Sequence, residues 1–370
     1  MVPFLDLKRI NEPYKNELDK AATDIVESGW YIRGHYGERF ERAFAEYCGV
    51  KYAVGVGNGL DALSLMLRAS MELGRLHAGD EILVPSNTYI ATVLAVSAVG
   101  LKPVLVEPAE NSYNIDPMRL KDACSAKTRG ILVVHLYGRL CDMDEICAFA
   151  KSHGLLVFED CAQAHGARLC DGRGAGTFGV ASAFSFYPTK NLGALGDAGM
   201  VVTNDGDIAK VVRALGNYGS EQKYVNKFRG VNSRLDEMQA ALLLAKLPHL
   251  DEWNKRRREV AARYCREIKN EKVFLPEMPA SPSEHVWHVF AVRLHDEATR
   301  NSLQDYLKTR GIGTLIHYPI PPHLQEAYAG SFDGEYPIAE AMAKTVLSIP
   351  MSPVLTDDEV SEVVGAINEF

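Results

Sequence analysis

The most unusual stretch of the chain is FGVASAFSFYPTKNLGALGDAGMVV, residues 178–202. Its apolar run ASAFSF (181–186) is typical of a buried strand, and a Tyr-Pro-Thr-Lys sequence and several glycines follow directly. A lysine at the mouth of a buried strand loses hydration, which lowers the pKa of its amine and makes the amine nucleophilic. An arbitrary lysine is usually a surface charge. In this context, however, Lys190 is predicted to be a reactive amine that can condense with an aldehyde.

The chain before this stretch alternates between short apolar runs and segments of helical composition. Such alternation predicts crossover units on a mostly parallel sheet that helices cover on both faces, in an α/β large domain of residues 1–245. Functional side chains of such sheets lie at the C-terminal ends of the strands. The predicted strands are 51–56, 80–86, 102–108, 130–136 and 154–160, and the predicted helices are 60–73, 88–98, 117–124 and 142–152.

The chain after residue 205 has a different pattern. Helix formers dominate residues 234–267, and Pro248 is expected to break or bend this helix. A smaller α+β domain is predicted over residues 246–370. One face of the long helix is expected to be apolar, with Leu235, Met238, Leu242 and Ala245. Beyond it we expect a strand at 286–294 and helices at 300–310 and 356–369, with disorder confined to parts of the Pro- and Gly-rich segments 277–285 and 319–336.

Composition limits the class of protein. The 370 residues are 47% hydrophobic and 24% charged, as in ordinary globular proteins, and the net charge of −8 argues against nucleic acid as a partner. The seven cysteines are irregularly spaced and contain no CxxC pair, which favours reduced thiols over disulfides or a zinc site. Without an apparent signal peptide or membrane span, the protein is expected to be cytoplasmic and free of the membrane.

Polar residues follow other predicted strands too. In EDCAQAHGA (159–167), Asp160 ends a strand, where its carboxylate could bind a protonated pyridine nitrogen, and Gln163 lies one turn later. Asp160 could equally cap the following helix.

The segment GVGNGLDAL (55–63) joins a strand to a helix whose first amides could bind a phosphate. Ser185 could add a hydroxyl to the same phosphate, or be bonded within its own sheet. Tyr89 offers a ring face, with core packing as the alternative.

Together these segments resemble the DegT/DnrJ/EryC1/StrS sugar aminotransferase family, within the fold-type I enzymes that depend on pyridoxal 5′-phosphate (PLP). The resemblance covers essentially the whole chain. It also includes SGWYIRG (28–34), HLYGRLCDMD (135–144), GVNSRLDEMQAA (230–241) and GIGTLIHYPIPPH (311–323).

The resemblance implies a role for each matching residue. Lys190 would hold PLP as a Schiff base, Asp160 would face the pyridine nitrogen and Gln163 the phenolic oxygen, and Tyr89 would stack on the ring. The phosphate would lie at Gly59, Leu60 and Asp61, with Ser185. Leu60 stands where many members have threonine, so one hydroxyl contact is expected to be missing. Asn232 resembles the asparagine that members lend to a neighbouring subunit, which implies a homodimer with shared active sites.

The resemblance also implies a reaction. PLP, with pyridoxamine phosphate (PMP) as its aminated form, would carry an amino group from L-glutamate to a keto sugar linked to a nucleotide. The form YPTKNLGALGDAG resembles members that act on dTDP-3-keto-6-deoxyhexoses and yield dTDP-3-amino-3,6-dideoxyhexoses. Sugar or nucleotide contacts are expected from Trp30, Tyr31, His317 and Tyr318, although these residues could instead pack at an interface. Diphosphate contacts are expected from Arg213, Arg229 or Lys223, although each of these could be an ordinary surface charge.

Two alternatives remain open, and the sequence argues against two others. The enzyme could aminate a 4-keto sugar instead, or the chain could be a regulatory member without catalysis. The family's dehydratase branch has histidine in place of the lysine, so Lys190 argues against that branch. A nicotinamide-dependent oxidoreductase needs a GxGxxG turn, which GVGNGL does not match.

Overall fold

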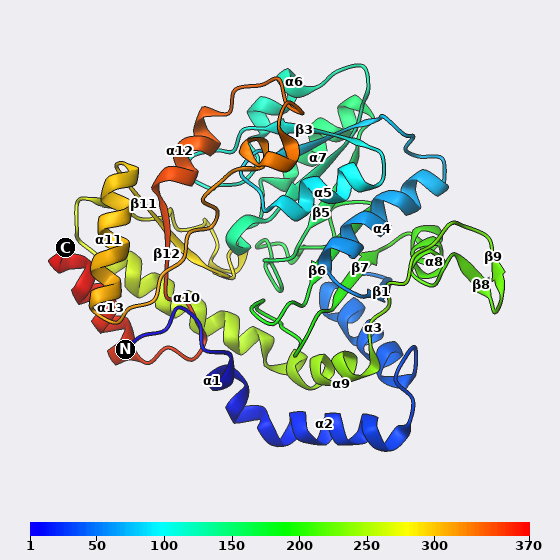
Figure 1. Cartoon of the computed structure of the whole chain (residues 1–370), viewed down its shortest axis with the longest axis horizontal. Helices are drawn as coiled ribbons and strands as arrows, with labels where there is room; N and C mark the ends of the chain where they lie inside the picture. Colours follow the sequence, from blue (N-terminus) through cyan, green and yellow to red (C-terminus); the bar gives the residue numbers. More distant parts are fainter.

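A seven-stranded sheet forms the centre of the larger part of the molecule (Figure 1). The computed structural model describes residues 1–370. The strand order is β1-β7-β6-β5-β4-β2-β3, and only β7 runs against its neighbours. The predicted α/β fold with a mostly parallel sheet is therefore confirmed. The strands are β1 (Tyr52–Val56), β2 (Glu81–Pro85), β3 (Lys102–Val106), β4 (Thr128–Val134), β5 (Leu156–Asp160), β6 (Ala181–Ser185) and β7 (Gly199–Thr203).

Helices cover both faces of this sheet because its strands are apolar on both sides. Side chains alternate between the faces of a strand. Ile82 and Val84 accordingly pack beneath α4 (Gly59–Glu72), α5 (Ile90–Ala98) and α8 (Gly206–Leu215), whereas Leu83 packs on the opposite side. That opposite face is covered by α3 (His35–Cys48), α6 (Leu120–Ala123), α7 (Met143–His153) and α9 (Glu237–Lys246).

The long helix predicted for residues 234–267 is two helices. Helix α9 ends at Lys246, a 3-10 turn covers Leu247–His249, and α10 spans Leu250–Glu267, so Pro248 interrupts the helix as expected. Three of the four residues of the predicted apolar face lie on α9, whereas Leu235 precedes the helix and packs in a different apolar cluster. Met238, Leu242 and Ala245 pack against α2 (Lys15–Ser28), which follows α1 (Leu7–Asn11).

A smaller antiparallel sheet lies beside the C-terminal helices. It contains β10 (Val273–Phe274), β11 (Phe290–Leu294) and β12 (Val346–Ile349), packed with α11 (Glu297–Thr309), α12 (Pro337–Thr345) and α13 (Asp357–Glu369). Val2 is buried in the same apolar cluster and pairs with Ile312, so the N-terminal residues lie against this sheet. The domain boundary at residues 245/246 stays a prediction.

Three segments differ from their predicted conformation. The strand expected at 286–294 begins only at Phe290, because the backbone amides of Val286 and His288 donate to the carbonyls of Gly138 and Tyr137. The Pro- and Gly-rich segments at 277–285 and 319–336 follow defined paths with short 3-10 helices at Pro282–Glu284, Pro322–Leu324 and Glu326–Tyr328.

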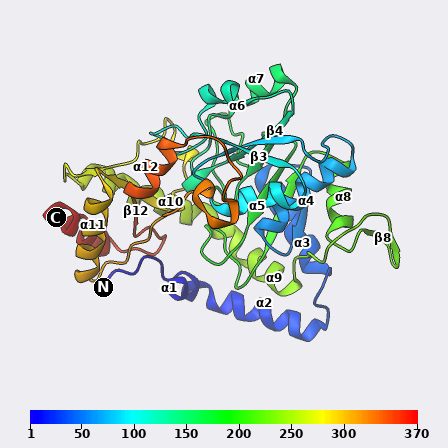
Figure 2. The same ribbon diagram turned by 45° about the horizontal axis from the view of Figure 1, so that its top comes forward.

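A small hairpin, not expected from the sequence, projects from the body of the molecule beside α8 (Figure 2). Its strands are β8 (Ser220–Gln222) and β9 (Val225–Asn226), and Tyr224 at its turn is 88% exposed. A polar hairpin of this length has no apolar alternation by which a sequence could reveal it.

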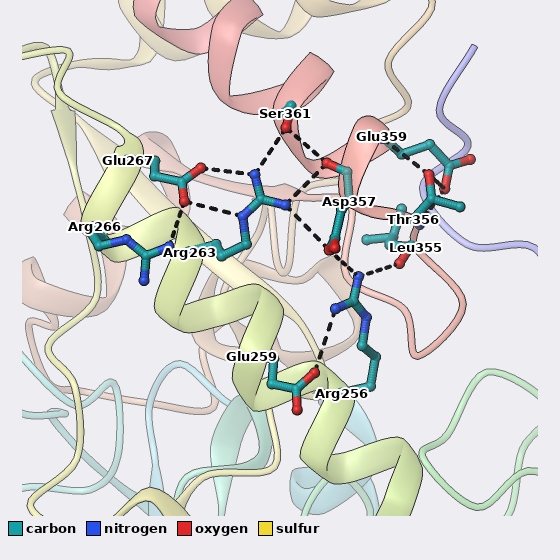
Figure 3. A network of polar contacts seen from close by, with 10 residues as sticks. All are labelled: Arg256, Glu259, Arg263, Arg266, Glu267, Leu355, Thr356, Asp357, Glu359 and Ser361. Atoms are coloured by element: carbon teal, nitrogen blue, oxygen red, sulfur yellow. Dashed lines mark hydrogen bonds and ion pairs between the residues drawn. The ribbon is translucent and has the colours of Figure 1, made fainter.

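Helix α10 connects the two sheets, and hydrogen bonds and ion pairs join its exposed side to α13. Arg263 pairs with Glu267 and reaches the carbonyl and carboxylate of Asp357, while Arg256 reaches the same carboxylate at 2.8 Å (Figure 3). No helix of the structure has both the length and the apolar character needed to cross a membrane.

Candidate active site

The predicted site residues gather at one edge of the large sheet. Strands β2, β5 and β6 run in the same direction, and β1 shares it because both β1 and β6 are antiparallel to β7. Their carboxyl ends therefore meet at the same edge, where ligands of such sheets bind. Asp160 ends β5 and Ser185 ends β6, while Gly59 and Tyr89 follow β1 and β2.

Lys190 lies half-buried in the loop that follows β6. Its backbone amide donates to the carbonyl of Tyr187 at 2.8 Å, which closes a tight turn. Burial lowers the pKa of its amine to about 8, against the opposing effect of the nearby Asp160 carboxylate. An amine with this pKa is neutral in about one molecule in ten at pH 7, far more than an ordinary lysine. The predicted reactive amine is thus explained by its surroundings.

Asp160 is a buried carboxylate with one hydrogen bond to each oxygen. Its Oδ2 accepts from the Thr92 hydroxyl at 2.9 Å and its Oδ1 from the Ala162 amide at 3.1 Å. Burial raises the pKa of Asp160, although these bonds and the charge of Lys190 oppose the shift. A cation placed beside this carboxylate would complete its charge balance. Sequence reasoning missed Thr92, whose hydroxyl also bonds that of Thr88 one helical turn away at 2.8 Å.

The neighbouring Glu159 points to the other side of β5 and is structural. Its carboxylate accepts bonds from His135, Ser182 and the amides of residues 176, 178 and 179. Burial disfavours its charge, but these donors, His135 above all, hold the pKa of Glu159 below its usual value. The cluster of His135, Glu159 and Cys161 is therefore a closed hydrogen-bond network, and no ligand is needed to satisfy it.

Gln163 is fixed by two hydrogen bonds, one within the large sheet's loops and one to the loop of the smaller sheet. Its Oε1 accepts from the Tyr137 amide at 2.6 Å, and its Nε2 donates to the Tyr318 hydroxyl at 3.0 Å. The Tyr318 ring lies 5.2 Å from the ring of Tyr89, which is 54% exposed. The Tyr137 hydroxyl in turn donates to the carbonyl of His317. The loop of the smaller sheet that contains His317 and Tyr318 thereby lies against Gln163 and Tyr89, and the predicted sugar contacts of these two residues stay a prediction.

Neutral histidines surround the lysine. Burial, and next the charge of Lys190, lowers the pKa of His317 to about 4 and that of His165 to about 3. The same two causes hold the pKa of His288 well below its usual value. These imidazoles stay neutral at pH 7, so none of them adds a positive charge that would compete with a cation at Asp160.

The N-terminus of α4 lies directly against the end of β6. Asn58 caps this 14-residue helix by accepting from the Asp61 amide at 2.8 Å, and the Asp61 carboxylate accepts from the Ser233 hydroxyl at 2.6 Å. The first two helical amides, of Gly59 and Leu60, have no acceptor within the helix. Free amides at a helix N-terminus can bind an anion, and these lie beside Ser185, whose Oγ accepts only a long bond, 3.3 Å, from the Tyr187 amide. The Asp61 amide, expected at the phosphate, is instead bonded to Asn58.

Replacing Gly59 with alanine is expected to weaken cofactor binding. The added Cβ would lie 2.5 Å from the Cβ of Ser185, so the helix start must move away from β6. Overpacking of this kind costs about 1–3 kcal/mol, or roughly 5- to 150-fold in a dissociation constant. Equilibrium titration of the cofactor-free variant with PLP measures the effect. Gly365→Ala in α13, where the new Cβ contacts nothing, is the matched control. An unchanged dissociation constant for Gly59→Ala would contradict the placement of the phosphate.

The structure does not bring every predicted residue to Lys190. The side chains of Trp30 and Tyr31 are 63% and 55% exposed and bond only to the backbone of Ile32 and Val26. Asn232 is exposed, and its backbone forms a bridge with Asn217.

The predicted diphosphate contacts are also not gathered at the site. Arg213 is held by both oxygens of the Glu41 carboxylate at 3.1 and 2.7 Å, so it is an ion-pair residue within this chain. Lys223 lies over the ring of Tyr224 in the hairpin, and the carbonyl of Arg229 accepts from Arg68.

The arrangement fits PLP at each of its chemical groups. A reactive amine suits its aldehyde, a buried carboxylate with an unbalanced charge suits its protonated ring nitrogen, and free helix amides suit its phosphate. The partly exposed ring of Tyr89 supplies a flat apolar face.

Comparison with known proteins agrees with this chemistry. Residues 13–368 match the DegT/DnrJ/EryC1/StrS aminotransferase family. The chain is 52% identical over 370 residues to the dTDP-3-amino-3,6-dideoxy-alpha-D-galactopyranose transaminase of Aneurinibacillus thermoaerophilus, covering 100% of this chain and 99% of that protein. It is 47% identical over 371 residues to the dTDP-3-amino-3,4,6-trideoxy-alpha-D-glucose transaminase of Streptomyces venezuelae, covering 100% and 96%.

Solved structures share the whole fold. DesV of S. venezuelae in complex with a ketimine intermediate superposes with a TM-score of 0.94 at 48% identity, covering 100% of this chain and 98% of DesV. NtdA of Bacillus subtilis with bound PMP superposes with a TM-score of 0.90 at 29% identity, covering 100% and 84%. With fold, site and sequence in agreement, the chain belongs to the DegT/DnrJ/EryC1/StrS aminotransferase family and is a PLP-dependent transaminase.

Proposed function

We propose that this enzyme transfers an amino group from L-glutamate to a dTDP-3-keto-6-deoxyhexose and yields a dTDP-3-amino-3,6-dideoxyhexose. The observation that carries the proposal is the pairing of a reactive Lys190 with the buried Asp160 in a chain whose whole length matches a transaminase named for that class of product. The second relative is also named for a dTDP-linked 3-amino sugar, although its sugar differs at C4. Both support amination at C3.

Lys190 holds the cofactor and moves the protons. Bound PLP supplies an aldehyde carbon for amine exchange and a ring that draws electrons from the adjacent carbon. The Lys190 amine, once released, would take the proton from the α-carbon of glutamate and deliver it to the aldehyde-derived carbon of the cofactor, acting as base and then acid. In the second half of the reaction the same amine moves a proton in the opposite direction, toward the sugar carbon. A pKa near 8 suits both tasks close to neutral pH.

Asp160 holds the ring nitrogen in its protonated form. Its carboxylate is positioned by Thr92 and Ala162, so it presents a fixed negative charge in a buried place. A charge preorganised in this way stabilises positive charge more strongly than water does. The amide of Gln163 is fixed by Tyr137 and Tyr318, and its second Nε2 hydrogen would be available to the phenolic oxygen of PLP.

The phosphate and ring contacts complete the proposed cofactor site. The amides of Gly59 and Leu60 bind the phosphate with the Ser185 hydroxyl, and Asp61 holds the helix start through its bonds to Asn58 and Ser233. Tyr89 packs on the ring. His317 and Tyr318 are the sugar-binding candidates that the fold brings to this place.

We also propose that two copies form a homodimer with shared active sites. Asn232, Trp30 and Tyr31 lie exposed and away from Lys190 of their own chain, which supports a role at a partner's site or at the interface. Light scattering is expected to give a dimer, and Asn232→Ala is expected to weaken PLP binding. A fully active monomer would contradict the proposal.

All seven cysteines are free, which supports a reducing compartment such as the cytoplasm.

The substrate assignment is tested by product analysis. The enzyme is supplied with PLP, L-glutamate and dTDP-4-keto-6-deoxyglucose, with or without a 3,4-ketoisomerase, and products are identified by mass spectrometry and NMR. Amine that forms only with the isomerase supports C3 chemistry, and the proton couplings at C4 distinguish the gluco from the galacto product. Amine at C4 without the isomerase would favour the 4-keto alternative. The absence of any amine from either sugar would favour a regulatory role.

A further inference from the structure

The face of helix α10 opposite to its exposed ion pairs carries two buried polar side chains. Asn254 is 1% exposed and Arg257 is 2% exposed, and residues three apart lie on the same helix face. Arg257 has no acidic partner. Its Nη1 donates instead to the carbonyls of Trp287, His288 and Met351 at 3.2–3.4 Å. Burying a polar side chain is unfavourable unless it is hydrogen-bonded. The hydrogen-bond partners of Asn254 therefore show which parts of the fold it holds together.

Asn254 bonds to two loops of the proposed active site, one with each end of its amide. Its Oδ1 accepts from Asn191 Nδ2 at 2.9 Å, and Asn191 directly follows Lys190. Its Nδ2 donates to the carbonyl of His165 at 2.8 Å, in the loop that contains Gln163 and begins at Asp160. One side chain therefore ties the loop of the lysine to the loop of the carboxylate.

The network around this asparagine is closed and tightly packed. Asn191 Nδ2 also donates to the carbonyl of Val286 at 3.0 Å, and Asn191 Oδ1 lies 3.1 Å from His288 Nδ1. Gly166, next to His165, has φ +86°, and a Cβ there would lie 2.9 Å from Asn254 Nδ2. Fully bonded buried networks of this kind hold a single arrangement.

We propose that Asn254 is a positioning residue that fixes Lys190 relative to Asp160 and Gln163 from outside both of their loops. The inference rests on the proposed function, because it assigns Asn254 an effect on the reaction of Lys190. Proton transfer depends on the distance and angle between the amine and the reacting carbon, and displacements of about 1 Å can cost 10²-fold in rate. Without Asn254, the two loops lose their shared hydrogen-bond partner and Lys190 loses its fixed distance from Asp160.

The test compares Asn254→Ala and Asn191→Ala, alone and combined, with wild-type holoenzyme. We expect kcat to fall roughly 10- to 100-fold in each single variant, with each KM within about 3-fold. The absorption band that depends on Lys190 is expected to change its pH midpoint. Reductive methylation of Lys190 in the cofactor-free protein should also proceed at a changed rate. Because both residues act through one contact, the double variant is expected to be little worse than the single ones.

The matched control is Arg256→Ala, two residues further along the same helix. Its side chain lies on the exposed face with Asp357 and the Leu355 carbonyl (Figure 3), so stability is expected to change slightly and the Lys190 readouts not at all.

Specific outcomes would overturn the inference. If Asn254→Ala melts at a lower temperature but keeps the wild-type kcat and absorption midpoint, the residue is only structural. If Asn254→Ala does not fold, Asn191→Ala decides alone by the same readouts. Wild-type protein without a Lys190-dependent band would instead overturn the proposed function on which the inference rests.

Discussion

Replacing Lys190 with alanine is expected to lower kcat by at least about 10³-fold and to abolish the absorption band that depends on the covalent link between Lys190 and PLP. The variant loses both the amine that attaches PLP and the group that moves protons in each half of the reaction. The measurement is steady-state transamination together with the absorption spectrum of reconstituted protein. A small primary amine added to the solution is expected to restore part of the activity, because it supplies the missing base.

The stability of this variant separates chemistry from folding. Burial lowers the pKa of Lys190 to about 8 in the folded chain, below its ordinary value near 10.5. The unfolded chain therefore binds this proton more tightly, and the lysine destabilises the fold most below pH 8. This destabilisation diminishes as the pH rises from 8 toward 10.5. Lys190→Ala is accordingly expected to melt no lower than wild type at pH 7. Exposed Lys255→Ala is the control, and wild-type kcat in Lys190→Ala would refute the assignment.

Replacing Asp160 with asparagine is expected to lower kcat about 10²- to 10³-fold. The amide keeps the shape of the carboxylate and can still accept from Thr92, but it has no charge to hold a proton on the ring nitrogen. Both halves of the reaction should slow, because both pass the same electron pair toward that nitrogen. Single-turnover absorbance, with glutamate or with the keto sugar, measures each half separately.

Thr92→Val is the matched control for this prediction. It removes one hydrogen bond to Asp160 and leaves the negative charge, so the expected loss is about 10-fold or less. A kcat within about 3-fold of wild type for Asp160→Asn would contradict the role of the carboxylate, since an electrostatic contribution of the usual size would then be absent.

Much of the large sheet could be predicted because each of its strands is a short, continuous apolar run. Strands buried on both faces have this pattern, and the ends of such strands point to the site. Asp160 and Ser185 lie at strand ends for that reason. The strand expected at 286–294 begins later because residues 286–288 bond to Tyr137 and Gly138, far away in sequence, and no local pattern records such a partner.

The supporting residues were not predictable in the same way. Thr92 bonds Asp160 across 68 positions and Asn254 bonds His165 across 89, so nothing near either residue in the chain identifies its partner. A threonine or asparagine within a helix is an ordinary polar residue until the fold buries it. The roles predicted for Trp30, Tyr31 and Asn232 depend on a second copy of the chain, which one sequence does not describe.

Lys190 is proposed to carry the cofactor, and a second buried lysine, Lys246, is the competing site of attachment. Burial also lowers the pKa of Lys246 to about 8, but its amine donates to the carbonyl of Gly193 at 2.6 Å and lies over the ring of Trp253. Of these two lysines, only Lys190 affects the pKa of Asp160.

Borohydride reduction of the PLP-loaded enzyme, followed by proteolysis and mass spectrometry, tests the claim most directly. The pyridoxyl phosphate group is expected on the peptide that contains Lys190, in close to one copy per chain. A label on Lys246 or on another lysine, with Lys190 unmodified, would contradict it.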